Sequence, residues 1–127
     1  MCRSPSGSYG FSLLGGYIEY MAIKERCFMP LDEAVSLEEG VLLLDTIGVP
    51  THALRKAKAE EAEAVAVFGC GPIGLGSISV LKAFSVPRIY AVDIVKYRLS
   101  LTSKLVALWI KFKNDINFFF TIFFTRL

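Results

Sequence analysis

Hydrophobic and polar positions follow a clear pattern in the second half of the chain. Residues 64–68 are continuously apolar and in part β-branched, as a parallel strand buried on both faces requires. Residues 73–84 carry apolar side chains at helical spacing, and the Ser-Val-Pro run that follows ends this helix. Residues 88–92 predict a second strand that closes on Asp93, and residues 96–108 predict another helix. This order of elements predicts an α/β fold with parallel strands.

The pattern before residue 64 is weaker. Residues 1–14 are rich in Ser and Gly and predict irregular structure. Residues 15–29 alternate only in part between apolar and polar positions, which predicts one or two short strands. Ser36 is followed three residues later by Glu39, the spacing of a capping box, so we predict that a helix begins at Ser36.

Two helix breakers divide the helical segment that follows. The interior of the first helix is apolar, and Gly48 and Pro50 then predict an interruption. A second helical stretch is predicted over residues 51–57, and residues 56–63 form a charged, exposed connector that leads into the first buried strand.

Composition excludes several classes of protein. The 127 residues allow one ordinary domain, and 54% hydrophobic against 20% charged residues argues against disorder. A net charge of +2, with basic residues not gathered into one stripe, argues against a nucleic-acid partner. The three cysteines have neither metal-knuckle nor redox-pair spacing. Together with an N-terminus that lacks an apolar signal region, they favour a reducing, cytoplasmic location.

The C-terminal tail differs from the rest of the chain. Residues 116–124 are apolar, aromatic and uncharged, but a membrane-spanning helix needs about 20 apolar residues, so we predict no membrane partner. A run of this kind is instead an aggregation hazard.

The motif with the strongest functional meaning is the G-x-G-x-x-G turn between the first strand and its helix. Gly69 permits the tight turn, Gly71 leaves room for a pyrophosphate, and Gly74 lets the helix lie close to the strand. Through Pro72 and Ile73 the chain enters the helix, whose first amides and dipole favour phosphate. The alternative is a glycine turn of another α/β protein that binds no dinucleotide.

Asp93 completes the predicted nucleotide site. It stands 19 residues after Gly74, at the end of the second strand. A carboxylate there can accept hydrogen bonds from both hydroxyls of an adenosine ribose and repels a 2′-phosphate. We therefore predict NAD as the cofactor and partner, with NADP disfavoured, bound to a Rossmann unit, which is a doubly wound parallel sheet.

The chain resembles the zinc-type medium-chain alcohol dehydrogenase family, which includes polyol and threonine dehydrogenases. The resemblance covers about residues 13–108 in the family's order and spacing. It rests on the Gly-Gly-Tyr-Ile-Glu-Tyr run at 15–20, Pro-Leu at 30–31, Ser-Leu-Glu-Glu-Gly at 36–40, Leu-Asp-Thr at 44–46 with His-Ala-Leu at 52–54, the glycines of 69–76 and Ala-Val-Asp at 91–93. It implies hydride transfer from an alcohol or polyol to NAD(P), with a zinc ion that polarises the oxygen.

The resemblance also assigns roles to single residues. Arg98 stands where the family often has a basic residue near the adenosine ribose; the alternative is an arginine on a solvated helix face. Asp45 stands where the family has its third zinc ligand, a Cys or an Asp, and a carboxylate is a legitimate zinc ligand; the alternative is a helix-terminal aspartate in solvent. His52 is interpreted as a packing or surface residue, and Cys70 as a small filler within the turn.

The departures from the family are equally informative. The family's first two zinc ligands, a Cys and a His-Glu pair, precede the stretch at which this chain begins, and the match fades after Leu108. The chain thus resembles a family fragment truncated at both ends, with two certain sheet strands and no zinc bound by this chain alone. We predict four parts. They are a remnant of the GroES-like catalytic domain with short strands (1–35), a helical connection (36–60), a partial Rossmann domain (61–108) and an unmatched tail (109–127).

Two functions follow from these predictions. The first is a piece of an NAD-dependent alcohol dehydrogenase that is catalytically incomplete alone. The second is a non-catalytic nucleotide-binding or interaction remnant, such as a pseudogene product. Because strand edges are exposed in a partial sheet, either form is predicted to associate with itself or with a complementary chain.

Overall fold

The computed structural model describes residues 7–105, 108–111 and 121–125. The chain divides into two compact units, with the boundary between Asp32 and Glu33. Within the described part, no helix is both long and apolar enough to cross a membrane.

The first unit is mostly irregular. Over residues 7–32 its regular structure is one 3-10 turn, η1 (Glu25–Cys27), and an isolated bridge between Tyr9 and Leu13. The prediction of one or two strands over residues 15–29 is therefore wrong. Tyr17 and Tyr20 are almost fully exposed, so these two side chains do not pack on the rest of residues 7–32. A lone pair of short strands without a layer to pack on is at best marginally stable.

The second unit begins with a helical segment, as the capping box predicts. The helix α1 (Leu37–Leu42) has Ser36 as its N-cap. The Ser36 hydroxyl accepts a hydrogen bond from the Glu39 amide at 3.2 Å, and the Glu39 carboxylate accepts one from the Ser36 amide at 2.9 Å. This pair satisfies two amides at the helix start.

The predicted interruption at Gly48 and Pro50 takes an unexpected form. The helix does not stop there. It widens into a π-helix, η2 (Leu43–Gly48), and continues directly as α2 (Val49–Lys56), with Pro50 in the first turn of α2. Pro50 has no amide hydrogen and cannot continue an α-helical ladder, so a change of hydrogen-bond pitch accommodates it without breaking the segment.

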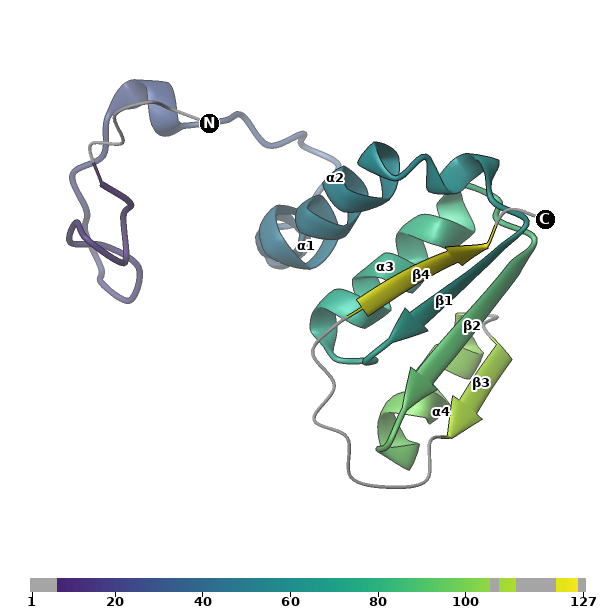
Figure 1. Ribbon diagram of the computed structural model, residues 1–127. Helices are drawn as coiled ribbons and strands as arrows, with labels where there is room; N and C mark the ends of the chain where they lie inside the picture. The colour runs from purple at the N-terminus through teal and green to yellow at the C-terminus, as the bar shows by residue number, and fades with distance from the viewer. Residues whose placement is uncertain (1–6, 106–107, 112–120, 126–127) are drawn as a thin grey trace. The chain divides into compact units, whose positions relative to one another are not determined.

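A four-stranded sheet follows, connected by two helices (Figure 1). Its elements after the short turn η3 (Ala59–Glu61) are β1 (Ala64–Phe68), α3 (Pro72–Ala83), β2 (Arg88–Asp93), α4 (Lys96–Lys104), β3 (Leu108–Lys111) and β4 (Thr121–Thr125). The strand order is β3-β2-β1-β4. The strands β1, β2 and β3 are parallel, and β4 is antiparallel to β1. The predicted α/β class and the two predicted strands are confirmed.

Two strands were not predicted. The helix α4 ends at Lys104, short of residue 108, because Leu108 already belongs to β3. The sheet therefore has four strands, β3 and β4 in addition to the two predicted ones. On the far side of β1, Val65 lies opposite Phe124 of β4. The backbone groups along an unpaired strand edge accept another extended segment irrespective of its sequence, which is why a pattern-based reading misses it.

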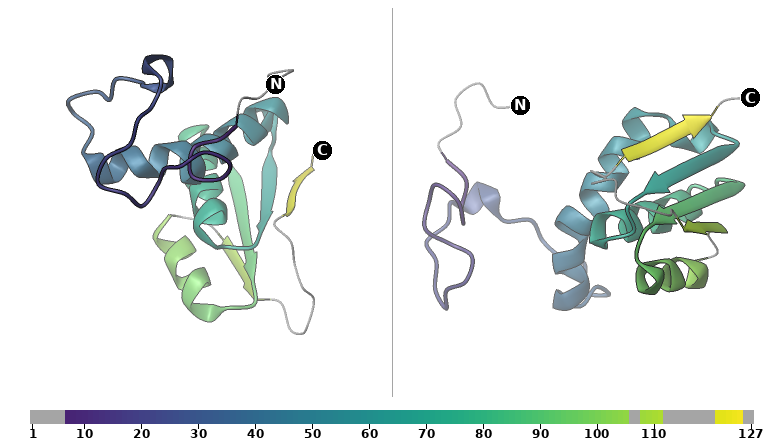
Figure 2. Two further views of the ribbon diagram at one scale, coloured as in Figure 1. Left: turned by 90° about the vertical axis from the view of Figure 1, so that its left-hand side faces the viewer. Right: turned by 60° about the horizontal axis from the view of Figure 1, so that its bottom comes forward.

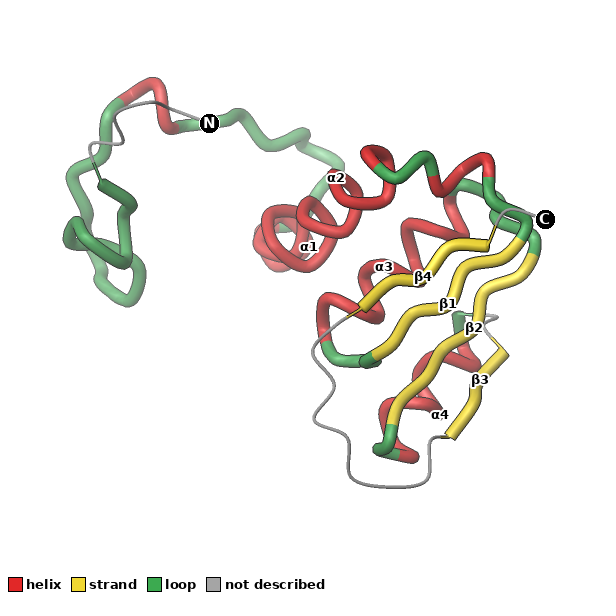
Figure 3. The backbone as a smooth tube through the Cα atoms, viewed as in Figure 1, coloured by secondary structure: helices red, strands yellow, loops and turns green. Residues whose placement is uncertain are grey.

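The main core lies between the sheet and its helices. Both crossovers step in the same direction along the sheet, from β1 to β2 to β3, so α3 and α4 cover the same face (Figures 2 and 3). Fully buried side chains from strands and helices meet there, among them Leu54, Val65, Val67, Ile78 and Leu81. This core fixes the carboxyl ends of β1 and β2 side by side, with Phe68 in register with Val92.

Candidate functional site

The glycine turn leaves the end of β1 and enters α3. Gly69 has φ +90°, a conformation that disfavours any residue with a side chain. A Cβ atom on Gly74 would overlap the carbonyl oxygen of Gly69, whereas a Cβ on Gly71 would meet nothing within 4 Å. Gly74 therefore allows close packing of the helix on the turn, and Gly71 keeps the outer side of the turn open.

The start of α3 presents amides toward this open side. Gly71 is the N-cap, Pro72 lies in the first turn, and the Leu75 amide makes the first helical bond, to the Gly71 carbonyl at 2.9 Å. The amides of Ile73 and Gly74 precede that bond and so have no acceptor within the helix. Together with the helix dipole they form a site suited to an anion.

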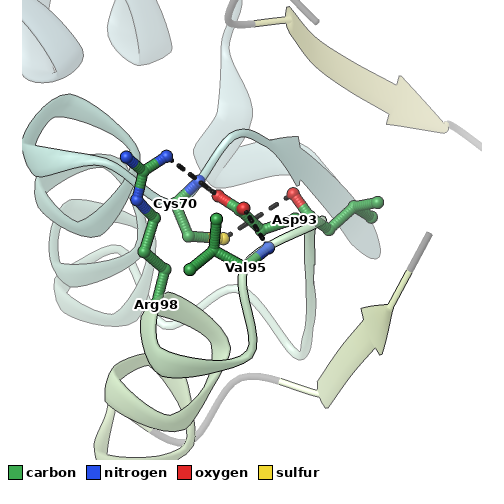
Figure 4. A network of polar contacts seen from close by, with 5 residues as sticks. Cys70, Asp93, Val95 and Arg98 are labelled. Atoms are coloured by element: carbon green, nitrogen blue, oxygen red, sulfur yellow. Dashed lines mark hydrogen bonds and ion pairs between the residues drawn. The ribbon is translucent and has the colours of Figure 1, made fainter. Parts of the chain in front are cut away.

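Asp93 lies at the end of β2, directly beside the turn, and its side chain is only 3% exposed (Figure 4). One carboxylate oxygen, Oδ2, accepts a hydrogen bond from the Cys70 amide at 2.7 Å. The other, Oδ1, accepts one from the Val95 amide at 2.8 Å. The predicted ribose acceptor is thus already bonded to the backbone on both of its oxygens.

Arg98 comes from α4 and reaches toward the same carboxylate. Its Nη1 lies 3.8 Å from Asp93 Oδ2, and the guanidinium side chain is half exposed. The structure therefore brings Arg98 to the predicted nucleotide site. Half of the side chain faces water, so the role of Arg98 near the ribose stays a prediction.

Cys70 fills the space beneath the turn. It is fully buried, and its thiol donates a hydrogen bond to the Val92 carbonyl at 3.7 Å. Burial, with the neighbouring Asp93 charge, raises the pKa of the Cys70 thiol to about 11. A thiol with so high a pKa is a poor nucleophile, in keeping with its interpretation as a filler.

The predicted metal position lies on other elements. Asp45 is on η2 with an exposed side chain, and His52 is on α2, also exposed. His52 lines an open hollow of about 600 Å³ with the apolar Leu43 and Ile47 and the basic Arg55 and Lys56. Residues 7–105, 108–111 and 121–125 bring together no group of three or more His, Cys, Asp or Glu side chains that could hold a metal. A catalytic zinc takes three protein ligands, so the described residues do not fit one.

Two features of the site escape a reading of the sequence. A Cβ on Gly76 would overlap the carbonyl oxygen of Thr46, so α3 and η2 meet backbone against backbone there. The second glycine of the Gly74-x-Gly76 pair is the one sign in the sequence that another backbone approaches α3 closely. The inward bonds of Asp93 had no signal in the sequence, because its partners are backbone amides.

No protein-family model matches the chain. The probable D-xylulose reductase A of Emericella nidulans is 41% identical over 93 residues, which cover 73% of this chain and 26% of that protein. Galactitol-1-phosphate dehydrogenase from Escherichia coli superimposes with a TM-score of 0.72 and 29% identity, over 80% of this chain and 29% of that one. A short chain alcohol dehydrogenase from E. coli CFT073, complexed with NADH, has the same fold with a TM-score of 0.75 and 24% identity, over 83% and 32% of the two chains.

The chain spans about a quarter of the length of the curated relatives that it matches. Within that span its sequence relatives include D-xylulose reductases and a butanediol dehydrogenase, and its strand–turn–helix–strand unit has the Rossmann fold of the solved dehydrogenases. The chain belongs to the zinc-type medium-chain alcohol and polyol dehydrogenase family.

Proposed function

We propose that the glycine turn and Asp93 bind the adenosine and pyrophosphate part of NAD, as part of an enzyme that oxidises an alcohol or polyol. One observation carries the proposal. The turn is closed by Gly69 and Gly74 on its inner side and open at Gly71 on its outer side, directly before the first amides of α3.

The pyrophosphate would lie against the backbone at Gly71. The Ile73 and Gly74 amides can donate to its oxygens, and the positive end of the α3 dipole favours its charge. Pro72 does not weaken α3, because the first-turn amide that it lacks would have had no helical acceptor.

The ribose would lie beside Asp93. A carboxylate has about four acceptor positions, and the amides of Cys70 and Val95 take two of them. Two remain for the ribose hydroxyls. The negative charge of Asp93 disfavours a 2′-phosphate, which supports a preference for NAD, and Arg98 partly offsets that charge.

Bound nicotinamide supplies a hydride acceptor to such a reaction. Asp45 stands at a zinc-ligand position of the family pattern, and we propose it as one ligand of a zinc site. The site needs further ligands, because the described residues place no two other His, Cys, Asp or Glu side chains beside Asp45. We therefore expect no zinc-dependent alcohol oxidation by the 127-residue chain alone; measured turnover with NAD would contradict this. No described feature favours a non-catalytic remnant as a second proposal.

Calorimetric titration of the chain with NAD tests the nucleotide site. We expect weak, saturable binding, in the range of about 1 mM, because the described residues offer contacts to the adenosine side of the cofactor. Gly71→Ala should abolish it, since the new methyl group fills the space of the pyrophosphate, while the melting temperature stays within about 2 °C of wild type.

Lys82→Ala, at the far end of the same helix, is the matched control and should bind NAD like wild type. Unchanged NAD affinity in Gly71→Ala would count against the proposal.

A further inference from the structure

Three backbone and thiol groups of the glycine turn are bonded to the last two residues of β2. The Gly69 amide and the Cys70 thiol both donate to the Val92 carbonyl, and the Cys70 amide donates to Asp93 Oδ2. Cys70 lies in a turn, outside any helix or strand ladder. Its buried amide therefore depends on a side chain for its acceptor, and a buried amide left without one costs free energy.

The other oxygen of Asp93 holds the far side of the same junction. Oδ1 accepts from the Val95 amide, two residues further along, where the chain leaves β2 for α4. The carboxylate therefore joins the β1–α3 turn to the β2–α4 loop. Both bonds are charge-assisted and short, which makes them stronger than bonds between neutral groups.

We propose that Asp93 is a positioning residue, which holds the glycine turn in its phosphate-receiving shape before any cofactor binds. The significance of that shape rests on the nucleotide site proposed above. The bonds themselves join backbone amides of this chain to one of its own side chains, so they need no atom of a cofactor.

Arg98 lies on the solvent side of the Asp93 carboxylate, where a ribose would approach. Half of its side chain, 51%, is in solvent. Its Nη1 stands at the long distance of 3.8 Å, beside the two amide bonds. Water can solvate the half-exposed guanidinium when it moves away, so a ribose can displace it while both amide bonds persist. The positioning role and ribose binding are therefore compatible.

The first test detects the bond directly in the wild-type, cofactor-free chain. In a ¹⁵N,¹³C-labelled sample we expect a through-hydrogen-bond coupling between the Cys70 amide nitrogen and the Asp93 carboxyl carbon. The Cys70 and Val95 amides should exchange with solvent at least about 100-fold more slowly than unprotected amides. Absence of the coupling together with rapid exchange would overturn the proposal, and neither measurement needs a variant to fold.

The second test separates positioning from direct contact with the ribose. Inorganic pyrophosphate has no ribose, so a residue that acts only on the ribose should not weaken its binding. Asp93→Asn removes a negative charge, which by itself would favour the anion. If Asp93 positions the turn, Asp93→Asn should nevertheless weaken pyrophosphate binding by about fivefold or more. Binding is measured from the chemical shifts of the Ile73 and Gly74 amides during titration. The melting temperature should fall by about 8 °C.

Glu63→Gln is the matched control. It changes a carboxylate to an amide at the opposite end of β1, where Glu63 makes an exposed ion pair with Arg88 at 3.4 Å. We expect unchanged pyrophosphate affinity and a melting temperature within about 2 °C of wild type. The same small effects in Asp93→Asn would overturn the positioning role. If wild type binds no pyrophosphate at all, the proposed nucleotide site fails, while the coupling and exchange still decide whether Asp93 holds the turn.

Discussion

Residues 15–29 and residues 64–93 both carry strand-like sequence, yet only the second region forms strands. In residues 64–93, β1 and β2 pair with each other and pack on α3. In residues 15–29 the aromatic side chains stay in solvent, and no strand forms. Apolar residues at strand spacing are therefore not sufficient. A strand also needs a neighbour for its backbone and a layer for its side chains.

Truncation of a core side chain should give the largest contrast between the two regions. Leu81 on α3 is fully buried, so Leu81→Ala should lower the free energy of unfolding by about 2–5 kcal/mol through lost contacts and a cavity. Tyr20, which is 90% exposed, is the counterpart in the first unit. Urea denaturation of Tyr20→Ala should differ from wild type by less than about 0.5 kcal/mol. Equal effects of the two substitutions would contradict the comparison.

The backbone contact between α3 and η2 gives the next largest effect. Gly76→Ala places a methyl group against the Thr46 carbonyl, which must move. We expect a loss of about 1–3 kcal/mol in urea denaturation. Ser79→Ala on the same helix, where the Ser79 hydroxyl only donates to the Leu75 carbonyl, serves as the control and should change stability little. A neutral Gly76→Ala would mean that the two helices are not in close contact.

The buried Cys70 thiol should make the second unit sensitive to alkali. Its pKa is raised from 9.0 to about 11 in the folded chain. Folding thus favours the neutral thiol. The contribution of this thiol to the free energy of unfolding is complete below pH 9 and is lost as the pH rises toward 11. Denaturation from pH 8 to 11 should show this loss in wild type and a smaller one in Cys70→Ala.

Thiol labelling provides an independent check on the same group. At pH 8, Cys70 should react with iodoacetamide about 100-fold more slowly in the folded chain than in urea, in line with its smaller thiolate fraction. Exposed Cys27 is the internal reference and should react readily in both states. Rapid labelling of Cys70 in the folded chain would contradict its burial.

The capping box should give the smallest effect. Ser36→Ala removes the acceptor for the Glu39 amide and should cost about 1 kcal/mol at the start of α1. Hydrogen bonds from Ser36 lower the pKa of Glu39 below its usual 4.5. The stabilisation is therefore present above pH 4.5 and is lost as the pH falls through the lowered pKa. A fall in the protection factors of the α1 amides on acidification would support this linkage. The fall should be smaller in Ser36→Ala, which loses the hydroxyl bond but keeps the backbone amide bond to Glu39.

The sequence predicts local features of this molecule better than long-range ones. The strands β1 and β2, the turn at Gly69 and the cap at Ser36 depend on neighbouring residues, and each lies where its motif indicates. The pairing of β4 with β1 joins residues more than fifty positions apart through backbone groups, and no side-chain motif encodes it. The same holds at Asp93, whose place beside the turn follows from the motif while its bonds to the Cys70 and Val95 amides do not.

Mapping amide chemical shifts during titration with NAD tests the central claim most directly. The described residues offer two candidate surfaces for an anionic ligand, the glycine turn and the open hollow between η2 and α2. We expect the shifts to gather at residues 69–75 and at Val95, and NADP to produce smaller shifts at the same concentration. Shifts at His52, Arg55 and Lys56 with none at the turn would contradict this expectation.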